Sequence, residues 1–213
     1  MLQVSYFTFN AFQENTYLIS DSAKRCWIVD PGMYHNDEVN IFRQHIEEKQ
    51  LTPVAIINTH AHLDHIFGVQ ALKDFYKIPF GVHKDEEPVL KMAPNSAAMF
   101  GFDGMVVPTP DFFISEKEPL KLGDDEVKVM LTPGHSPGSI SFYYEPGAWV
   151  ISGDVLFSGS IGRTDLPGGN FDTLINSIRT HLLPLPDKTQ VLSGHGTPTR
   201  IDTEKKYNPY LNA

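Results

Sequence analysis

Thr59-His60-Ala61-His62-Leu63-Asp64-His65 is a heptapeptide with five side chains that can bind or support a metal ion, and none of the five suits an apolar core. A β-rich apolar run, residues 53–58, comes directly before it, and residues 66–75 have apolar side chains at helical spacing. We therefore expect the histidines to lie on a loop between a strand and a helix.

The spacing within this loop would allow it to supply ligands to two metal ions. His60 and His62, two residues apart, can project to the same side of a nearly extended chain and bind one ion. The adjacent pair Asp64 and His65 leaves in other directions and can reach a second ion. Imidazole and carboxylate suit zinc, iron or manganese, and the loop offers no thiolate. The alternative interpretation is a polar surface loop rich in histidine, which further ligands elsewhere in the chain would exclude.

Composition and charge indicate a protein with a small-molecule substrate. With 213 residues the chain can bury a full core, and we expect a single domain over residues 1–213. No apolar run approaches the roughly 18 residues of a membrane span, and the amino terminus lacks an export signal, so we expect a cytoplasmic protein. The net charge of -9, with no basic cluster beyond Lys205-Lys206, argues against a nucleic-acid partner. The single cysteine, Cys26, excludes an intrachain disulfide and is expected to be a buried, inert thiol.

Hydrophobic patterns and turn residues predict strands and helices in both halves of the chain. Strands are expected over residues 2–9, 15–20, 25–29, 53–58, 78–82, 119–122, 126–131, 140–144, 149–152 and 189–192, and helices from Asn36 to about Gln50 and over residues 66–75, 85–92 and 170–183. Two mixed sheets packed together with helices outside satisfy this order.

Two regions allow more than one interpretation. Residues 93–110 are expected to form a loop whose Met and Phe side chains either line an apolar substrate cleft or attach the loop to the core. Asp30, in Asp30-Pro31-Gly32, either supports the metal site from behind its ligands or forms a turn, and we do not predict it to be a ligand.

Three further candidate ligands share one sequence setting. His135, Asp154 and His195 each follow a predicted strand, and each is preceded by glycine. Glycine permits unusual backbone angles and close approach of the chain, which a loop needs to direct a ligand into a crowded centre. With the heptapeptide they give five histidines and two aspartates, the number that two metals with one bridging carboxylate require.

This ligand set resembles the metallo-β-lactamase superfamily, in its glyoxalase II-like branch. Residues 152–157, 162–165 and 208–211 look most like the compact, single-domain bacterial members of that branch, without a carboxy-terminal helical extension. The resemblance implies an α+β protein with the four-layer αββα sandwich, two mixed sheets and outer helices. It also implies a division of the ligands: His60, His62 and His135 on the first metal, Asp64, His65 and His195 on the second, and Asp154 bridging both.

Two departures bear on the substrate that the resemblance implies. Full-length glyoxalase II enzymes use the carboxy-terminal extension to help hold glutathione, and they tend to have Glu-Tyr-Thr after the last histidine, where this chain has Gly196-Thr197-Pro198. Zinc β-lactamases of the superfamily often use a cysteine near the bridging position, whereas this chain has Asp154, which favours the other hydrolase branches.

The main prediction is a metal-dependent hydrolase of an anionic thioester such as an S-2-hydroxyacylglutathione. The cofactors would be two divalent ions, zinc in the first place, with iron or manganese as alternatives, and the nucleophile a hydroxide that bridges them. Asp64 and Asp154 are the predicted catalytic carboxylates. Arg163 is predicted either to bind the anionic substrate or to form an ion pair with Asp165.

Three other functions remain open from the sequence. A mononuclear iron persulfide dioxygenase looks similar and would keep two histidines and one carboxylate on iron. Lactonases and phosphodiesterases of the same superfamily are further hydrolase alternatives. A non-catalytic metal-binding or scaffold protein is a different class, which a complete ligand set disfavours.

Overall fold

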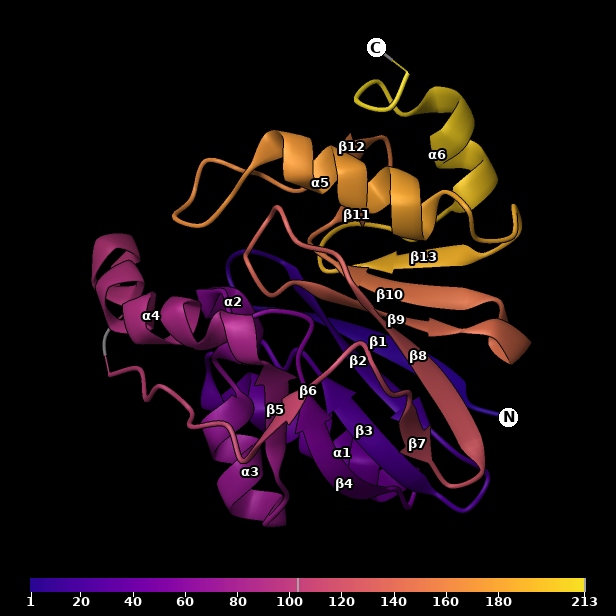
Figure 1. The fold of residues 1–213 in the computed structure, drawn as a ribbon. Helices are drawn as coiled ribbons and strands as arrows, with labels where there is room; N and C mark the ends of the chain where they lie inside the picture. Colours follow the sequence, from indigo (N-terminus) through magenta and orange to yellow (C-terminus); the bar gives the residue numbers. More distant parts are fainter. Residues whose placement is uncertain (103, 213) are drawn as a thin grey trace. The chain divides into compact units, whose positions relative to one another are not determined.

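The computed structural model describes residues 1–102 and 104–212 (Figure 1). The chain forms two compact units, unit 1 with Met1–Ile114 and Leu122–Asp125, and unit 2 with Ser115–Lys121 and Glu126–Ala213. The elements up to residue 114 are β1 (Gln3–Phe9), β2 (Glu14–Ser20), β3 (Arg25–Val29), α1 (Asn36–Glu48), β4 (Thr52–Ile57), α2 (Leu63–Ile66), α3 (Val69–Tyr76), β5 (Phe80–His83), η1 (Lys84–Glu86), α4 (Glu87–Phe100) and β6 (Phe112–Ile114).

The later part of the chain adds eight strands and two α-helices. They are β7 (Leu120–Leu122), β8 (Asp125–Leu131), β9 (Ile140–Tyr144), η2 (Glu145–Gly147), β10 (Trp149–Gly153), β11 (Leu156–Phe157), β12 (Ser160–Ile161), α5 (Phe171–Ser177), η3 (Ile178–Leu182), β13 (Gln190–Ser193), β14 (Thr199–Arg200) and α6 (Ile201–Tyr207).

Unit 1 contains a six-stranded mixed sheet in the order β1-β2-β3-β4-β5-β6. The first three strands pair antiparallel, and β3 to β6 pair in parallel. Helices α1, α3 and α4 bury Phe42, Leu72 and Leu90 in one core cluster with Ile28 and Phe80 of the sheet. The carboxyl ends of the parallel strands therefore lie on a well-packed support, and the loops that leave them can be held in place.

The structure corrects the prediction for residues 85–110. Instead of a short helix and a long loop, α4 continues from Glu87 to Phe100 with Pro94 inside it. Proline removes one helical hydrogen bond, but Val89, Ala93 and Ala97 are buried at a spacing of four residues, and burial of this stripe outweighs that loss. The Met99 side chain is 79% exposed and takes no part in the core, whereas Met105 and Val107, farther along the predicted loop, pack against the core of unit 1.

The helix predicted over residues 66–75 is two helices in the structure. The short helix α2 begins at Leu63, inside the heptapeptide, and α3 begins at Val69 after Gly68. Asp64 and His65 therefore lie on a helical turn, whereas His60 and His62 lie on the loop before it. The prediction that the ligands lie on a strand-to-helix loop is right for His60 and His62 and wrong for Asp64 and His65.

Unit 2 contains the second sheet, in the order β14-β13-β10-β9-β8-β7, with β10 and β13 in parallel. The predicted strands of this half agree with β7 to β10 and β13 to within one residue at each end. The predicted helix is present as α5, capped where the Asn170 side chain accepts a hydrogen bond from the Thr173 N–H at 2.9 Å, and it continues as a π-helical turn, η3. The hairpin β11–β12, β14 and α6 were not predicted. Two-residue strands leave no periodic pattern, and α6 has only seven residues.

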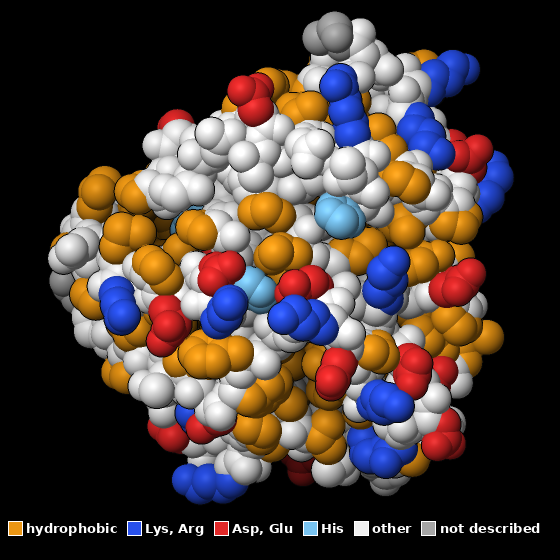
Figure 2. Space-filling view, viewed as in Figure 1, with side chains coloured by type: hydrophobic (Ala, Val, Ile, Leu, Met, Phe, Trp, Pro, Cys, Tyr) orange, Lys and Arg blue, Asp and Glu red, His pale blue; other side chains and the backbone are white. Residues whose placement is uncertain are grey.

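Two surface predictions can be compared with the structure in part. Among the described residues, no helix is both long and apolar enough to cross a bilayer. On the face drawn in Figure 2, Lys and Arg side chains lie among Asp and Glu side chains instead of forming one continuous basic patch. The absence of a nucleic-acid partner stays a prediction.

Candidate metal centre

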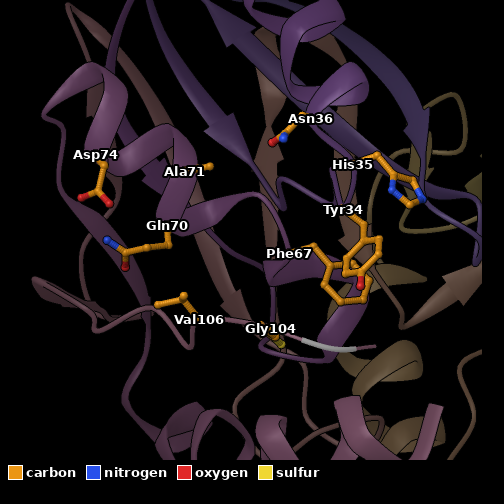
Figure 3. A pocket seen from close by; sticks show the side chains of 10 residues that line it. Tyr34, His35, Asn36, Phe67, Gln70, Ala71, Asp74, Gly104 and Val106 are labelled. Atoms are coloured by element: carbon orange, nitrogen blue, oxygen red, sulfur yellow. The ribbon is translucent and has the colours of Figure 1, made fainter. Parts of the chain in front are cut away.

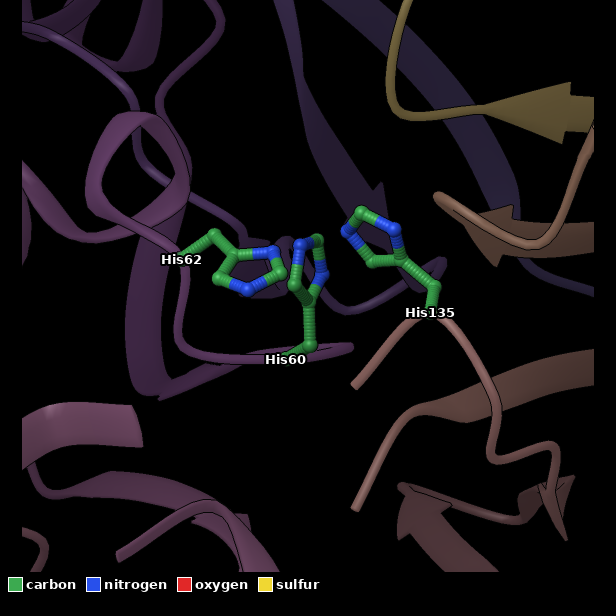
Figure 4. Close-up of side chains that lie close together, drawn as sticks. All are labelled: His60, His62 and His135. Carbon is green, nitrogen blue, oxygen red and sulfur yellow. The ribbon is translucent and has the colours of Figure 1, made fainter. Parts of the chain in front are cut away.

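The loop after β4 holds its histidines close together in unit 1. The ring centroids of His60 and His62 are 4.9 Å apart at an angle of 89°, and those of His60 and His65 are 4.1 Å apart. Figure 4 shows His60 and His62 on this loop, and His135 on the loop that follows β8. His60 and His65 are fully buried, and the Asp64 side chain is 15% exposed. Unit 1 thus brings four of the predicted ligands into one small region.

Asp30 supports this loop from behind, at the end of β3. Its backbone lies in the left-handed region, with φ of 48°, which Asp tolerates better than most residues. The carboxylate accepts hydrogen bonds from the Thr59 N–H at 2.7 Å, from the Thr59 hydroxyl at 2.5 Å and from Nδ1 of His65 at 3.1 Å. Of the two roles that the sequence left open, Asp30 both forms the turn and supports the site.

The same hydrogen bonds determine where two imidazole protons lie. Since Thr59 donates its only hydroxyl proton to Asp30, its oxygen accepts the contact from Nδ1 of His60 at 3.0 Å. His65 likewise carries its proton on Nδ1, because a carboxylate oxygen only accepts. Both rings therefore have their lone pair on Nε2, the form in which a histidine binds metal.

Two buried polar side chains fix the backbone of the loop. Asn58 donates from Nδ2 to the carbonyl oxygens of His60 and His65 at 3.3 and 2.8 Å. Glu86, fully buried, accepts the Ala61 N–H at 2.8 Å. Sequence reasoning missed the role of Glu86, because this residue lies in a run of charged residues that looks solvent-exposed.

A second buried carboxylate, Glu14, lies beside His65. Its Oε1 is 3.8 Å from Nδ1 of His65, and its Oε2 accepts a hydrogen bond from the Thr16 hydroxyl at 2.9 Å. Burial raises the pKa of Glu14 well above its ordinary value, against the opposing effect of His65. A side chain at Gly32 would overlap Oε2 of Glu14, so only glycine leaves room for this carboxylate.

A cavity of about 500 Å³ opens in unit 1 beside helix α3 (Figure 3). The rings of Tyr34 and Phe67 lie 4.9 Å apart at one side, and Gln70 and Asp74 line the α3 side. Met105 also lines the cavity, so part of the predicted 93–110 loop does border an open space. Among the described residues, its lining includes no Lys or Arg.

In unit 2, His135 is positioned by close backbone packing. Gly134 has φ of 128°, and a side chain there would overlap the backbone of Leu174 in α5, so the glycine is required. His135 is buried, and its Nδ1 lies 2.8 Å from the carbonyl oxygen of Arg163, to which it must donate. Its Nε2 is therefore the metal-binding atom, as in His60 and His65.

Asp154 and His195 complete the candidate ligands of unit 2. The loops that carry them are joined by a hydrogen bond from the Gly194 N–H to the Gly153 carbonyl oxygen at 2.9 Å. Oδ2 of Asp154 is 3.5 Å from Nε2 of His135 and 3.5 Å from Nε2 of His195. One carboxylate oxygen thus lies equally near two imidazoles, a position suited to a carboxylate that two ions share.

Arg163 is engaged in an exposed ion pair. Its Nε and Nη2 donate to the two oxygens of Asp165 at 2.7 and 2.8 Å. This hydrogen-bonded pair holds the pKa of Asp165 at about 2. Because exposed ion pairs exchange partners at little cost, this contact leaves the predicted substrate-binding role of Arg163 open.

The donor set of both units fits divalent metal ions. Neutral imidazoles and carboxylates suit zinc, iron and manganese, and hydrogen bonds to oxygen leave Nε2 of three buried histidines to face an ion. Ligand atoms of Asp30, His60 and His65 lie within 4.8 Å of one another, so Asp30 could also bind a metal. Its oxygens already accept three hydrogen bonds, and we therefore assign Asp30 the role of holding the loop and His65 in place.

Comparisons with known proteins identify the family. The family model of the metallo-beta-lactamase superfamily matches residues 9–195. The hydroxyacylglutathione hydrolase GloC of Haemophilus influenzae is 40% identical over 205 residues, which cover 95% of this chain and 95% of that protein. The chain belongs to the metallo-beta-lactamase superfamily. This confirms the resemblance seen in the sequence. Membership of this superfamily also supports the prediction that the protein is a metal-dependent hydrolase.

Solved structures confirm the metallo-beta-lactamase fold. The crystal structure of the BLEG-1 B3 metallo-beta-lactamase has a TM-score of 0.90 and 39% identity, and covers 99% of this chain and 100% of that chain. The crystal structure of TTHA1623 in a di-iron-bound form has a TM-score of 0.86 and 35% identity, over 97% and 100% of the two chains. The predicted metallo-beta-lactamase fold, of the α+β class with two mixed sheets and helices, is therefore confirmed.

Proposed function

We propose that the protein hydrolyses an anionic thioester, such as an S-2-hydroxyacylglutathione, with two divalent metal ions. In this proposal His60, His62 and His135 hold one ion, Asp64, His65 and His195 hold the other, and Asp154 binds both. The observation that carries it is the common state of His60, His65 and His135, whose Nδ1 atoms are hydrogen-bonded to oxygen so that Nε2 is prepared for metal.

The ligands have distinct chemical tasks in this proposal. When bound, divalent ions supply Lewis acidity toward a carbonyl oxygen and lower the pKa of water into the neutral range. Asp154, with Oδ2 3.5 Å from Nε2 of both His135 and His195, would supply the carboxylate that the two ions share. Asp64, unlike the fully buried Asp30, reaches solvent and can orient a water molecule for attack.

The choice of a thioester rests on the related GloC, whose name is that of a hydroxyacylglutathione hydrolase. Arg163 supports an anionic substrate, because its guanidinium is exposed and its pair with Asp165 is replaceable. The backbone carbonyl of Arg163 also accepts the hydrogen bond that orients His135. A substrate carboxylate bound to Arg163 would therefore lie near a metal ligand of unit 2.

The test is turnover by the full chain loaded separately with zinc, iron and manganese. We expect S-lactoylglutathione to be hydrolysed, and His62→Ala to abolish the reaction, whereas His181→Ala, an exposed histidine on η3, retains it. Loss of activity in both variants, or no hydrolysis with any metal, would reject the proposal.

Two other reactions belong in the same assay. β-Lactam hydrolysis is a second candidate because the similar protein BLEG-1 is a B3 metallo-beta-lactamase, and a chromogenic cephalosporin tests it. Oxygen consumption with glutathione persulfide tests the iron dioxygenase. Hydrolysis of the cephalosporin alone, or oxygen consumption with one iron per chain, would replace the thioester proposal.

A further inference from the structure

The hairpin β11–β12 lies next to the candidate ligands of unit 2. Asp154 lies two residues before it in the chain, and the ring of Phe157 on β11 is 6.2 Å from the ring of His195. Arg163, two residues after β12, provides the carbonyl oxygen that accepts the hydrogen bond from His135. The position of this short hairpin therefore affects three side chains of the proposed metal centre.

Two buried residues at the carboxy-terminal end hold the hairpin. Glu204 on α6 accepts hydrogen bonds from the Thr199 hydroxyl at 2.6 Å, from the Gly159 N–H at 3.0 Å and from Nδ2 of Asn208 at 2.8 Å. Asn208 also donates from Nδ2 to the Ser160 carbonyl oxygen at 3.0 Å. Glu204 is 1% exposed and Asn208 is fully buried. We call Glu204 and Asn208 the hairpin clamp.

The segment between the clamp and His135 is short and tightly packed. Ser160, which Asn208 holds, is three residues before Arg163, which His135 contacts. Gly162 lies between them, and a side chain there would overlap the Asp154 carbonyl oxygen and lie 3.2 Å from Nδ1 of His135. A shift of the hairpin cannot be absorbed in so little chain, so it would move the carbonyl that orients His135.

The clamp is more than α6 needs for its own attachment. Ile201 already anchors α6 in the core of unit 2, and Lys205 pairs with Asp187 at 2.7 Å. A buried carboxylate is costly to desolvate and a well-packed apolar residue often stabilises as much. The three hydrogen bonds of Glu204 instead specify the place of two particular backbone groups, at Gly159 and, through Asn208, at Ser160.

We propose that Glu204 and Asn208 are positioning residues of the metal centre, which set the orientation of His135 through the β11–β12 hairpin and the Arg163 carbonyl. This rests on the metal centre of the proposed function and gives a role to the segment at residues 208–211 that the ligand set does not use. The effect is geometric, so the charge of Glu204 is not required.

The proposal is tested by cobalt binding to the metal-depleted full chain, followed by the visible absorption of bound cobalt. We expect Glu204→Ala and Asn208→Ala to weaken cobalt at the site of His135 by about tenfold, the low end for residues that support a ligand. Glu204→Gln should stay within about twofold, because its amide oxygen can accept from Gly159 and Asn208 while its NH₂ donates to the Thr199 hydroxyl. Lys205→Ala, on the same helix, is the matched control.

A second readout needs no metal. In the metal-depleted protein the Nδ1–H of His135 should give a slowly exchanging imidazole NMR signal, assigned by its loss in His135→Gln. We expect this signal to weaken or shift in Asn208→Ala and to be unchanged in Lys205→Ala. Asn208→Ala decides the matter if Glu204→Ala does not fold.

Three results would overturn the proposal. One is equal cobalt affinity in Asn208→Ala and the native chain, and another is an equal loss in Lys205→Ala, which would mean general destabilisation. The third is a loss in Glu204→Gln as large as in Glu204→Ala, which would assign the effect to charge. Cobalt binding does not depend on the substrate, so a failed thioesterase assay would refute the proposed function and leave this result unaffected.

Discussion

Replacing Asp30 by asparagine should weaken metal binding while the fold remains. The substitution keeps the shape and the acceptor for the Thr59 N–H, but places an NH₂ group against the Thr59 hydroxyl and Nδ1 of His65. The Thr59 hydroxyl can rotate to accept. His65 must then move its proton from Nδ1 to Nε2, and Nε2 can no longer bind an ion.

The size of the effect follows from the contact that is lost. A hydrogen bond to a charged group contributes about 1.5–3 kcal/mol, and each 1.4 kcal/mol is about tenfold in affinity. Since His65 makes one such bond with Asp30, at 3.1 Å, we expect Asp30→Asn to weaken zinc binding by about 10- to 100-fold. The measurement is a zinc titration of the metal-depleted chain in competition with a chromophoric chelator.

Asp21→Asn is the matched control for this substitution. Asp21 is also a buried carboxylate of unit 1, but it accepts hydrogen bonds from the backbone N–H and the Nε of Arg25, away from the metal loop. We expect its zinc affinity to equal that of the native chain. Zinc affinity within threefold of native in Asp30→Asn, or an equal loss in Asp21→Asn, would refute the assigned support of His65.

Three further predictions follow from the sites described. Asp154→Ala should abolish hydrolysis and lower the metal content from about two ions per chain while the far-UV circular dichroism stays native, because the sheets form the core; near-full activity in a metal-analysed sample would contradict a shared carboxylate. Arg163→Met should lower kcat/KM for a charged thioester by roughly tenfold or more and spare a neutral one, with little change in Tm since its pair with Asp165 is exposed; equal losses on both would remove Arg163 from the site. Cys26 should react with a thiol reagent only after denaturation, because burial raises its pKa to about 12, and rapid reaction of the native protein would exclude that burial.

Local pattern was sufficient for most of the strands and for the candidate ligands. Turn residues separate the antiparallel strands β1 to β3, and Asn170 caps the start of α5. Nearby residues in the sequence therefore mark where these elements begin and end. The ligands are recognisable for the same reason, since histidine and aspartate follow apolar runs, with glycine before His135, Asp154 and His195. The superfamily could be named from these residues, and the family comparison confirms it.

Tertiary packing decided the elements whose local signals are weak or contrary. In α4, burial of Ala93 and Ala97 in unit 1 outweighs the helix-breaking effect of Pro94. The proline is visible in the sequence, whereas the burial is visible only in the folded structure. β14 and β12 are two residues long and form only because a partner strand is present.

The supporting network of the ligands also required the folded structure. Glu14 and Glu86 look like surface charges in the sequence, and both are buried beside the metal loop because chain segments far apart in sequence meet there. Side-chain identity determines which atoms can bind a metal, but hydrogen bonds between distant residues determine which nitrogen of each histidine carries the proton. The sequence by itself therefore determined the chemistry of the candidate site, and the packing of each unit determined the state and orientation of its ligands.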